Sequence, residues 1–204
     1  MRNFGDIMFT ETVKAEQEKR GSRAGYARMT ARPAPDGVSE REAEFIAARD
    51  SFYMASVNEE GWPYVQHRGG PRGFLKVLGP TRLGFADYRG NKQYVSTGNL
   101  TTDDRVSLFL MDYPNRARLK MLARAKIQSA EDAPEIARLL ETAGQGHVER
   151  IFTLEVEAFD WNCPQFITPR FTEEDVRAVI APQLEAMKAE NAALKAQVAA
   201  LAEV

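Results

Sequence analysis

The sequence predicts a mainly β fold with flanking helices (α+β): a small antiparallel barrel of six to seven strands, followed by a C-terminal helix. Three observations support this. From residue 52, short runs rich in β-branched and aromatic residues alternate with tight turns such as Asn58-Glu59-Glu60-Gly61 and Gly79-Pro80-Thr81. Helical patterns are confined to the two ends and to two short insertions. No G-x-G-x-x-G or Walker loop accompanies the strands, so a parallel α/β sheet is disfavoured.

Composition excludes several classes of protein. The 204 residues are enough for one well-buried domain with some extra length, and the 44% hydrophobic content argues against disorder. No apolar run approaches the roughly 18 residues of a membrane span, so we expect no membrane association. The single cysteine, Cys163, can form no internal disulfide, which favours a reducing compartment, the cytoplasm. The net charge of −2 disfavours a general nucleic-acid binder, and no cluster suggests a metal site.

Residues 1–50 are expected to form an N-terminal helical segment. Residues 5–19 place Ile7, Met8, Val13 and Ala15 among acids and lysines, as in a short amphipathic helix. Residues 21–37 are expected to be a loop, with Pro33, Pro35 and Gly37 as breakers. A second helix is expected to begin at Ser39, because Ser39 and Glu42 have the spacing of a capping box.

Residues 51–171 are expected to form the barrel. The predicted strands are residues 52–57, 63–68, 74–78, 82–85, 106–113, 118–128 and 152–159. Two helical insertions are expected, at residues 91–98 and 133–142.

Residues 172–204 are expected to form a helix that begins at Thr172, with acids in its first turn where the helix dipole favours them. Its a and d heptad positions are Leu184, Met187, Asn191, Leu194, Val198 and Leu201. A single polar a position favours a parallel two-stranded coiled coil. The alternative is that this apolar stripe packs on the chain's own barrel.

Positive charge is concentrated in the middle of the chain. Residues 64–92 and residues 105–126 each contain six Lys or Arg against one acid. In an acidic protein, this indicates a local anion site such as a phosphate pocket. Solvated faces of strands are the alternative.

Two segments suggest where that anion would bind. Arg68 ends a predicted strand, where Gly69 and Gly70 would let a ligand approach the backbone. Asn91 and Lys92 are expected at the start of a helix, whose free N–H groups attract phosphate. Together these residues predict a phosphate cradle. A turn with a solvated lysine is the alternative.

These segments, together with the strand order and Trp161-Asn162-Cys163-Pro164-Gln165, resemble the pyridoxamine 5'-phosphate oxidase-related family. The resemblance covers residues 4–171. It implies an FMN-binding split β-barrel that works as a homodimer, with FMN at the interface.

The resemblance also implies roles for individual residues. Arg68 matches the strand arginine on the FMN phosphate, and Gly69 and Gly70 would run beside the flavin ring. Asn91 and Lys92 match the pair that contacts the phosphate.

Five further residues have weaker parallels in the family. Ser96 and Asn99 would follow on the same helix. Trp161 and Arg170 resemble residues that reach the flavin from the partner subunit, and Gln165 would lie between them. A buried interface aromatic is the alternative for Trp161.

One departure concerns the substrate. Between Trp161 and Arg170, pyridoxamine phosphate oxidases carry an Arg-x-His element that grips the vitamin phosphate, and this sequence has no histidine there. Pyridoxamine phosphate oxidation is therefore not expected.

The sequence leaves the catalytic residues unknown. We expect an FMN-dependent oxidoreductase that passes hydride between a nicotinamide donor and a small-molecule acceptor. A non-catalytic flavin- or haem-binding protein on the same barrel is the alternative, and a deazaflavin could replace FMN. His67 is expected to pack or to hydrogen-bond, and Cys163 lacks a neighbouring cation that would activate its thiol.

Overall fold

The computed structural model describes residues 1–161 and 164–202, which form two compact units. The first unit comprises Met1–Asp112 and Ala117–Gln165, and it contains the sheet and the short helices. The second unit comprises Tyr113–Arg116 and Phe166–Val204, and it contains one long helix.

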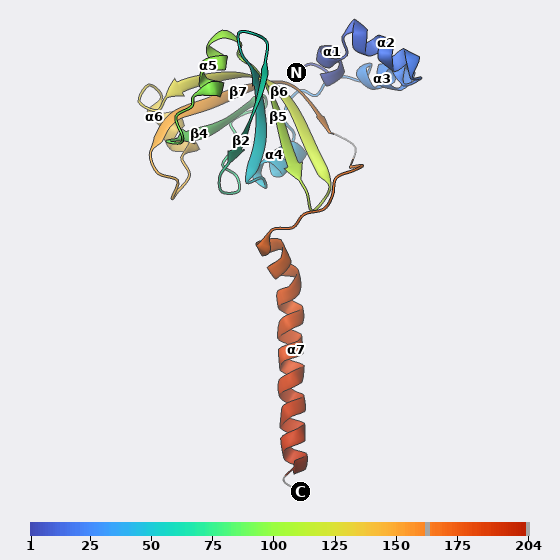
Figure 1. Cartoon of the computed structure of the whole chain (residues 1–204), viewed down its shortest axis with the longest axis vertical. Coiled ribbons are helices and arrows are strands. Elements are labelled where there is room, and N and C mark those ends of the chain that lie inside the picture. The colour runs from blue at the N-terminus through green and yellow to red at the C-terminus, as the bar shows by residue number, and fades with distance from the viewer. Residues whose placement is uncertain (162–163, 203–204) are drawn as a thin grey trace. The chain divides into compact units, whose positions relative to one another are not determined.

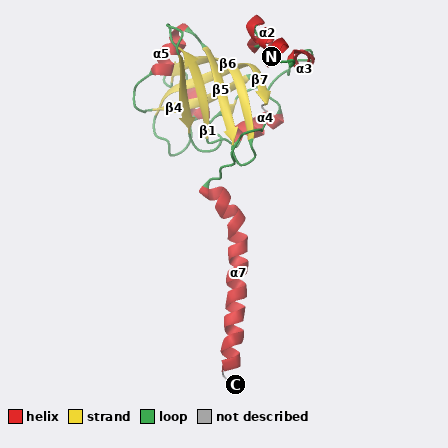
Figure 2. Ribbon diagram, turned by 45° about the vertical axis from the view of Figure 1, so that its right-hand side comes forward, coloured by secondary structure: helices red, strands yellow, loops and turns green. Residues whose placement is uncertain are grey.

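A curved, seven-stranded antiparallel sheet forms the body of the first unit (Figures 1 and 2). Its strands are β1 (Ser51–Val57), β2 (Pro63–Gly69), β3 (Lys76–Val77), β4 (Arg82–Tyr88), β5 (Arg105–Asp112), β6 (Ala117–Ser129) and β7 (Val148–Trp161). The strand order is β2-β1-β5-β6-β7-β4-β3. The predicted mainly β, split-barrel-like fold with flanking helices is therefore confirmed.

The core lies inside the curved sheet. Alternate residues of β1 and β5 point inward, such as Phe52 and Leu108, which are at most 1% exposed. The rings of Phe85 and Phe152 stack with centroids 4.7 Å apart. Large aromatic side chains bury 150–250 Å² each, so they contribute much of the stability of a small barrel.

One helix covers the core and is hydrogen-bonded to the last residue of β7. Helix α4 (Glu40–Ala47) begins with the predicted capping box and buries Ile46 completely. The Glu42 carboxylate accepts hydrogen bonds from the Ser39 backbone N–H, at 3.1 Å, and from the Trp161 indole Nε1, at 2.7 Å. Burial alone would raise the pKa of Glu42, but its hydrogen bonds to Ser39 and Trp161 more than offset burial and lower the pKa.

We expect Glu42→Gln to destabilise the protein by about 1–3 kcal/mol at pH 7, because the amide cannot accept from every one of these donors. Since the folded-state pKa of Glu42 is lowered, its contribution is present above the unfolded pKa of about 4.3 and is lost as pH falls through the folded value. Urea unfolding of both proteins from pH 7 down to pH 3 measures this. A difference that does not shrink on acidification would contradict the assignment.

The N-terminal segment differs from the prediction. Residues 5–19 form two helices, α1 (Phe4–Met8) and α2 (Glu11–Lys19), instead of one. The break occurs because Thr10 is extended and its side chain accepts a hydrogen bond from the Val13 N–H at 3.3 Å, which caps α2.

The predicted loop at residues 21–37 also contains a helix, α3 (Arg23–Thr30). The sequence does not indicate this helix, because the segment contains Gly25 and lacks the apolar periodicity of a helix. Long-range contacts hold it in place: the Asn3 side chain donates to the Thr30 carbonyl at 3.1 Å, and the Phe9 and Tyr26 rings lie 5.2 Å apart.

The two insertions are helical but shifted or shortened. Helix α5 is Val95–Thr102, against the predicted 91–98, and α6 is Pro134–Leu140, against 133–142. The strand β3 is shorter than expected, whereas β7 extends the predicted 152–159 at both ends.

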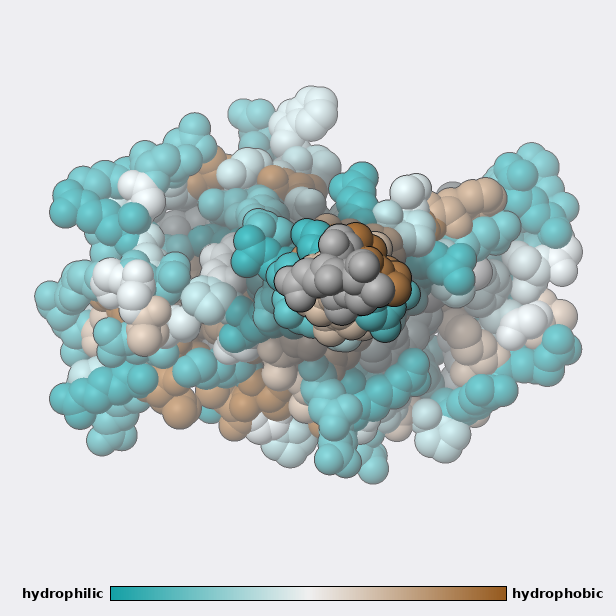
Figure 3. All heavy atoms as spheres, turned by 90° about the horizontal axis from the view of Figure 1, so that it is seen from below, coloured by the Kyte–Doolittle hydropathy of each residue, from teal (hydrophilic) through white to brown (hydrophobic). Residues whose placement is uncertain are grey.

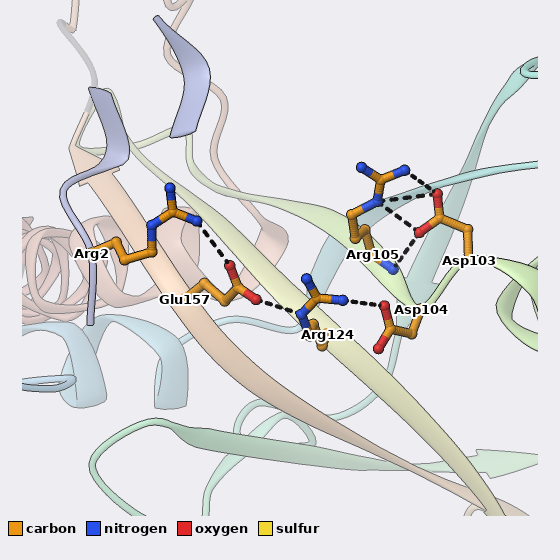
Figure 4. A network of polar contacts seen from close by, with 6 residues as sticks. All are labelled: Arg2, Asp103, Asp104, Arg105, Arg124 and Glu157. Atoms are coloured by element: carbon orange, nitrogen blue, oxygen red, sulfur yellow. Dashed lines mark hydrogen bonds and ion pairs between the residues drawn. The ribbon is translucent and has the colours of Figure 1, made fainter. Parts of the chain in front are cut away.

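Much of the second basic stretch is occupied by ion pairs (Figure 4). Arg124 donates to Glu157 at 2.5 Å and to Asp104 at 2.7 Å, and Arg105 pairs with Asp103. Hydrogen bonds from Arg105 lower the pKa of Asp103 to about 2. Arg105 and Arg124 therefore form ion pairs on exposed strand faces.

In the second unit, helix α7 runs from Glu173 to Ala202 without interruption at Pro182. Thr172 and Asp175 cap it reciprocally, as the sequence predicted. Among the described residues, no helix is both long enough and apolar enough to span a membrane.

Candidate functional site

A polar cavity of about 310 Å³ lies beside β2, the residue 88–95 segment and the beginning of β7. Its lining residues are Tyr64, Gln66, Arg68, Asp87, Tyr88, Gly90, Asn91, Lys92, Gln93, Tyr94, Val95, Ser96, Thr97 and Arg150. The structure thus brings together four of the predicted site residues, Arg68, Asn91, Lys92 and Ser96.

Two arginines in this cavity share one carboxylate. Arg68 Nη1 donates to Asp87 Oδ1 at 2.7 Å, and Arg150 donates to Asp87 Oδ2 through Nε at 3.0 Å and Nη2 at 2.7 Å. The three side chains are only 12–20% exposed. Burial alone would lower the pKa of Arg150, but its hydrogen bonds to Asp87 and Tyr94 raise it, so this cation persists.

The strand register creates this cluster. Asp87 and Arg150 are directly opposed on β4 and β7, and Arg68 comes from β2. Asp87 and Arg150 were not among the site residues predicted from the sequence. Only the register between β4 and β7, two strands far apart in sequence, brings these residues together. The sequence alone does not specify that register.

Arg68 retains a donor that the protein does not use. Its Nε is buried and has no hydrogen-bond partner among the described residues. The guanidinium lies 4.9 Å from the centroid of the Phe152 ring. Buried donors without a partner are rare and costly, so an anionic oxygen in the cavity would satisfy this group.

Asn91 and Lys92 reach the cavity from a loop, which corrects the prediction that they begin a helix. Helix α5 starts three residues later, at Val95. Lys92 and Tyr94 both have left-handed backbone conformations, with φ of 60° and 54°. The Asn91 side chain accepts from the Gln93 N–H at 3.1 Å, and this turn precedes the helix.

The two predicted residues on α5 have different environments. Ser96 lines the cavity and donates to Gln66 Oε1 at 2.8 Å. Asn99 is buried and donates to Ser56 Oγ at 2.9 Å, and it is not among the lining residues. Asn99 therefore anchors α5 to β1.

The chain itself packs against Gly70, whereas Gly69 is exposed beside the His67 side chain. A Cβ on Gly70 would lie 2.7 Å from the Phe74 ring, and a Cβ on Gly69 would lie 3.0 Å from His67. The Gly70 N–H donates to the Asp50 carbonyl at 2.9 Å. Neither glycine is among the residues that line the cavity.

The last three predicted residues are not lining residues of the cavity. Trp161 is half-buried; its ring contacts Phe45 edge-on at 4.7 Å. Gln165 is exposed. Arg170 belongs to the second unit, where it lies 4.9 Å from the Tyr113 ring. Cys163 is outside the described residues.

The chemistry available in the cavity is anion binding. Arg68, Arg150 and Lys92 supply positive charge against Asp87, and hydroxyl and amide groups surround them. His67 is exposed and contacts Tyr53, with ring centroids 5.6 Å apart. In the described part of the chain, no group of three or more His, Cys, Asp or Glu side chains could hold a metal ion.

Comparisons with known proteins identify the family. A family model described as pyridoxamine 5'-phosphate oxidase matches residues 38–158. The chain therefore belongs to the pyridoxamine 5'-phosphate oxidase family, as its motifs suggested. No curated protein sequence matches the chain.

Solved structures are similar to the chain at low sequence identity. HupZ of Group A Streptococcus is 12% identical, with a TM-score of 0.51 over 66% of this chain and 99% of that one. A Clostridium acetobutylicum protein related to general stress protein 26 (pyridoxinephosphate oxidase family) is 12% identical, with a TM-score of 0.44 over 60% and 85%. An FMN-binding protein of Syntrophomonas wolfei is 10% identical, with a TM-score of 0.45 over 72% and 97%.

Proposed function

We propose that the protein binds FMN, with the phosphate in the Arg68 cavity, and acts as an oxidoreductase between a nicotinamide donor and a small-molecule acceptor. The buried Nε of Arg68, which has no partner among the described residues, is the observation that supports this most strongly, because Arg68 lines a cavity to which Lys92 and Arg150 add positive charge. Membership of a flavin-binding family agrees with it.

The donor set suits a phosphate monoester. Arg68 offers its guanidinium and Lys92 offers an ammonium on a loop, while the Ser96 hydroxyl donates to Gln66 and the Asp87 carboxylate accepts from Arg68 Nη1. Charge-assisted hydrogen bonds of this kind are the strong ones in proteins. A bound FMN supplies hydride transfer through its ring system, and the protein's part is to hold and orient it.

The cavity volume of about 310 Å³ is at the lower end of the range for small-molecule sites, roughly 300–1,000 Å³. It suits the phosphate end of FMN and leaves the ring to be covered by another surface. We propose that a second copy provides that surface, with FMN at the interface of a homodimer. Under this proposal Trp161, Gln165 and Arg170 approach the flavin from the partner.

The outer face of β1 and β2 supports the homodimer. Tyr53 is 40% exposed and Val65 is 59% exposed on this face, and Trp62, in the turn between the two strands, is 70% exposed. Contiguous exposed apolar residues of this kind mark interaction sites, and C2 pairing is the commonest arrangement of homo-oligomers. Because the single cysteine can form no internal disulfide, we also propose that this dimer works in the cytoplasm.

The experiment that separates enzyme from binding protein is turnover of NAD(P)H by the full-length, flavin-loaded protein. We expect the flavin absorbance to bleach when NADH or NADPH is added under anaerobic conditions. We then expect an acceptor from a panel of quinones, nitro compounds and dyes to reoxidise the flavin. A flavin that stays oxidised with both donors would contradict the oxidoreductase and favour the non-catalytic alternative. Binding of haem in place of flavin would favour the haem-binding variant of that alternative.

A further inference from the structure

Helix α7 presents an apolar stripe that has no covering partner among the described residues. The stripe comprises Ile180, Leu184, Met187, Leu194, Val198 and Leu201, which are 46–78% exposed. Figure 3 looks along this helix and shows hydrophobic side chains on one side of its end and hydrophilic ones on the other. An amphipathic helix normally buries such a stripe.

The stripe has the period of a coiled coil. The continuous helix passes through Pro182, so Ile180 joins the heptad as a d position ahead of Leu184. From Ile180 to Leu201 the seam residues alternate at spacings of four and three. Pro182 occupies an f position, on the side of the helix opposite to the seam, where a partner helix would not meet it.

The polar residues on and beside the seam specify what covers it. Asn191 is the polar residue at an a position, and such a residue is satisfied by the same residue of a parallel, in-register partner. In a parallel pair, Glu190 at g faces Lys195 at e of the other chain. In an antiparallel pair, the e positions, which include Lys188 and Lys195, would face each other and repel.

We propose that α7 pairs with α7 of a second copy of this chain as a parallel, in-register two-stranded coiled coil. A coil this short is marginal by itself, but the proposed barrel dimer would raise the effective concentration of one helix at the other. The coil would in turn stabilise the barrel dimer. Its formation does not require a flavin.

Cysteine cross-linking of the full-length chain tests the pairing and its direction. In a Cys163→Ser background, Leu184→Cys and, separately, Leu201→Cys place a thiol near each end of the seam. Mild oxidation should then give about tenfold more covalent dimer than Ala189→Cys, an f-position control, because only seam residues meet their own copies. A protein that cross-links in this way but takes up no flavin on titration would contradict only the proposed function.

Three outcomes would overturn the inference. Absence of Leu184→Cys dimer would mean that the stripe is covered by another surface, such as the chain's own barrel. Cross-linking of Leu184→Cys to Leu201→Cys only when the two are mixed would mean an antiparallel pair. Asn191→Val keeps the helix intact and should raise the melting temperature of the coil and admit higher oligomers; an unchanged mass and melting curve would also contradict the seam.

Discussion

Asp87→Ala is expected to cost about 3 kcal/mol of unfolding free energy, because it leaves the largely buried guanidinium of Arg68 without a carboxylate and leaves Arg150 with the carboxylate of Glu149, at 3.4 Å. Arg68 would also lose the contact that orients it, so flavin binding should fall with stability. Urea unfolding and flavin content of the purified variant measure the two effects.

A matched control is Asp160→Ala, which removes the carboxylate partner of Lys120 at 2.8 Å on the same sheet. Both of these side chains are 26% exposed, against 12–20% in the Asp87 cluster, and among the described residues a single cation depends on this carboxylate, so we expect a cost below about 1 kcal/mol. Asp87→Asn should fall between the two, because its amide oxygen still accepts from one arginine. Equal free energies of unfolding for Asp87→Ala and Asp160→Ala would show that the Asp87 cluster contributes no more stability than an ordinary ion pair.

The second large effect is expected on affinity. Arg68→Met should weaken FMN binding by about 2–5 kcal/mol, since it removes a buried charged donor, while Asp87 keeps Arg150 as its partner. Lys92→Ala removes a solvent-accessible donor and should cost about 1.5–3 kcal/mol. Calorimetric titration of flavin-free protein gives both values.

The control for these variants is Lys126→Ala, which removes an exposed positive charge that is not part of the cavity lining. Its FMN affinity should equal that of the unmodified protein. Riboflavin, which lacks the phosphate, should bind to all four proteins with similar affinity. A loss of riboflavin binding in Arg68→Met as large as the loss of FMN binding would mean that Arg68 does not hold the phosphate.

The strands were predictable because alternating burial along β1 and β5 leaves a direct trace in the sequence. The N-terminal helices were less so, because α3 carries no apolar period and is held by distant residues such as Asn3. Helix starts were predictable from local capping patterns, because Ser39 and Thr172 cap helices in the structure.

The site was partly predictable for the same reason. Arg68, Asn91 and Lys92 lie in short distinctive segments, and they converge on one cavity. Asp87 and Arg150 become neighbours only through the pairing of β4 with β7, and no local sequence pattern specifies this pairing. Gly70 also has a structural role, because a Cβ at this position would meet Phe74 of its own chain.

The proposed function requires that the Arg68 cavity selects the phosphate of FMN. Titration of the flavin-free, full-length protein with FMN and with riboflavin measures this selectivity. We expect one FMN per chain and an affinity for FMN at least about tenfold higher than for riboflavin, since a single charge-assisted hydrogen bond is worth that much. A folded protein that takes up no FMN, or that binds the two flavins equally, would contradict it.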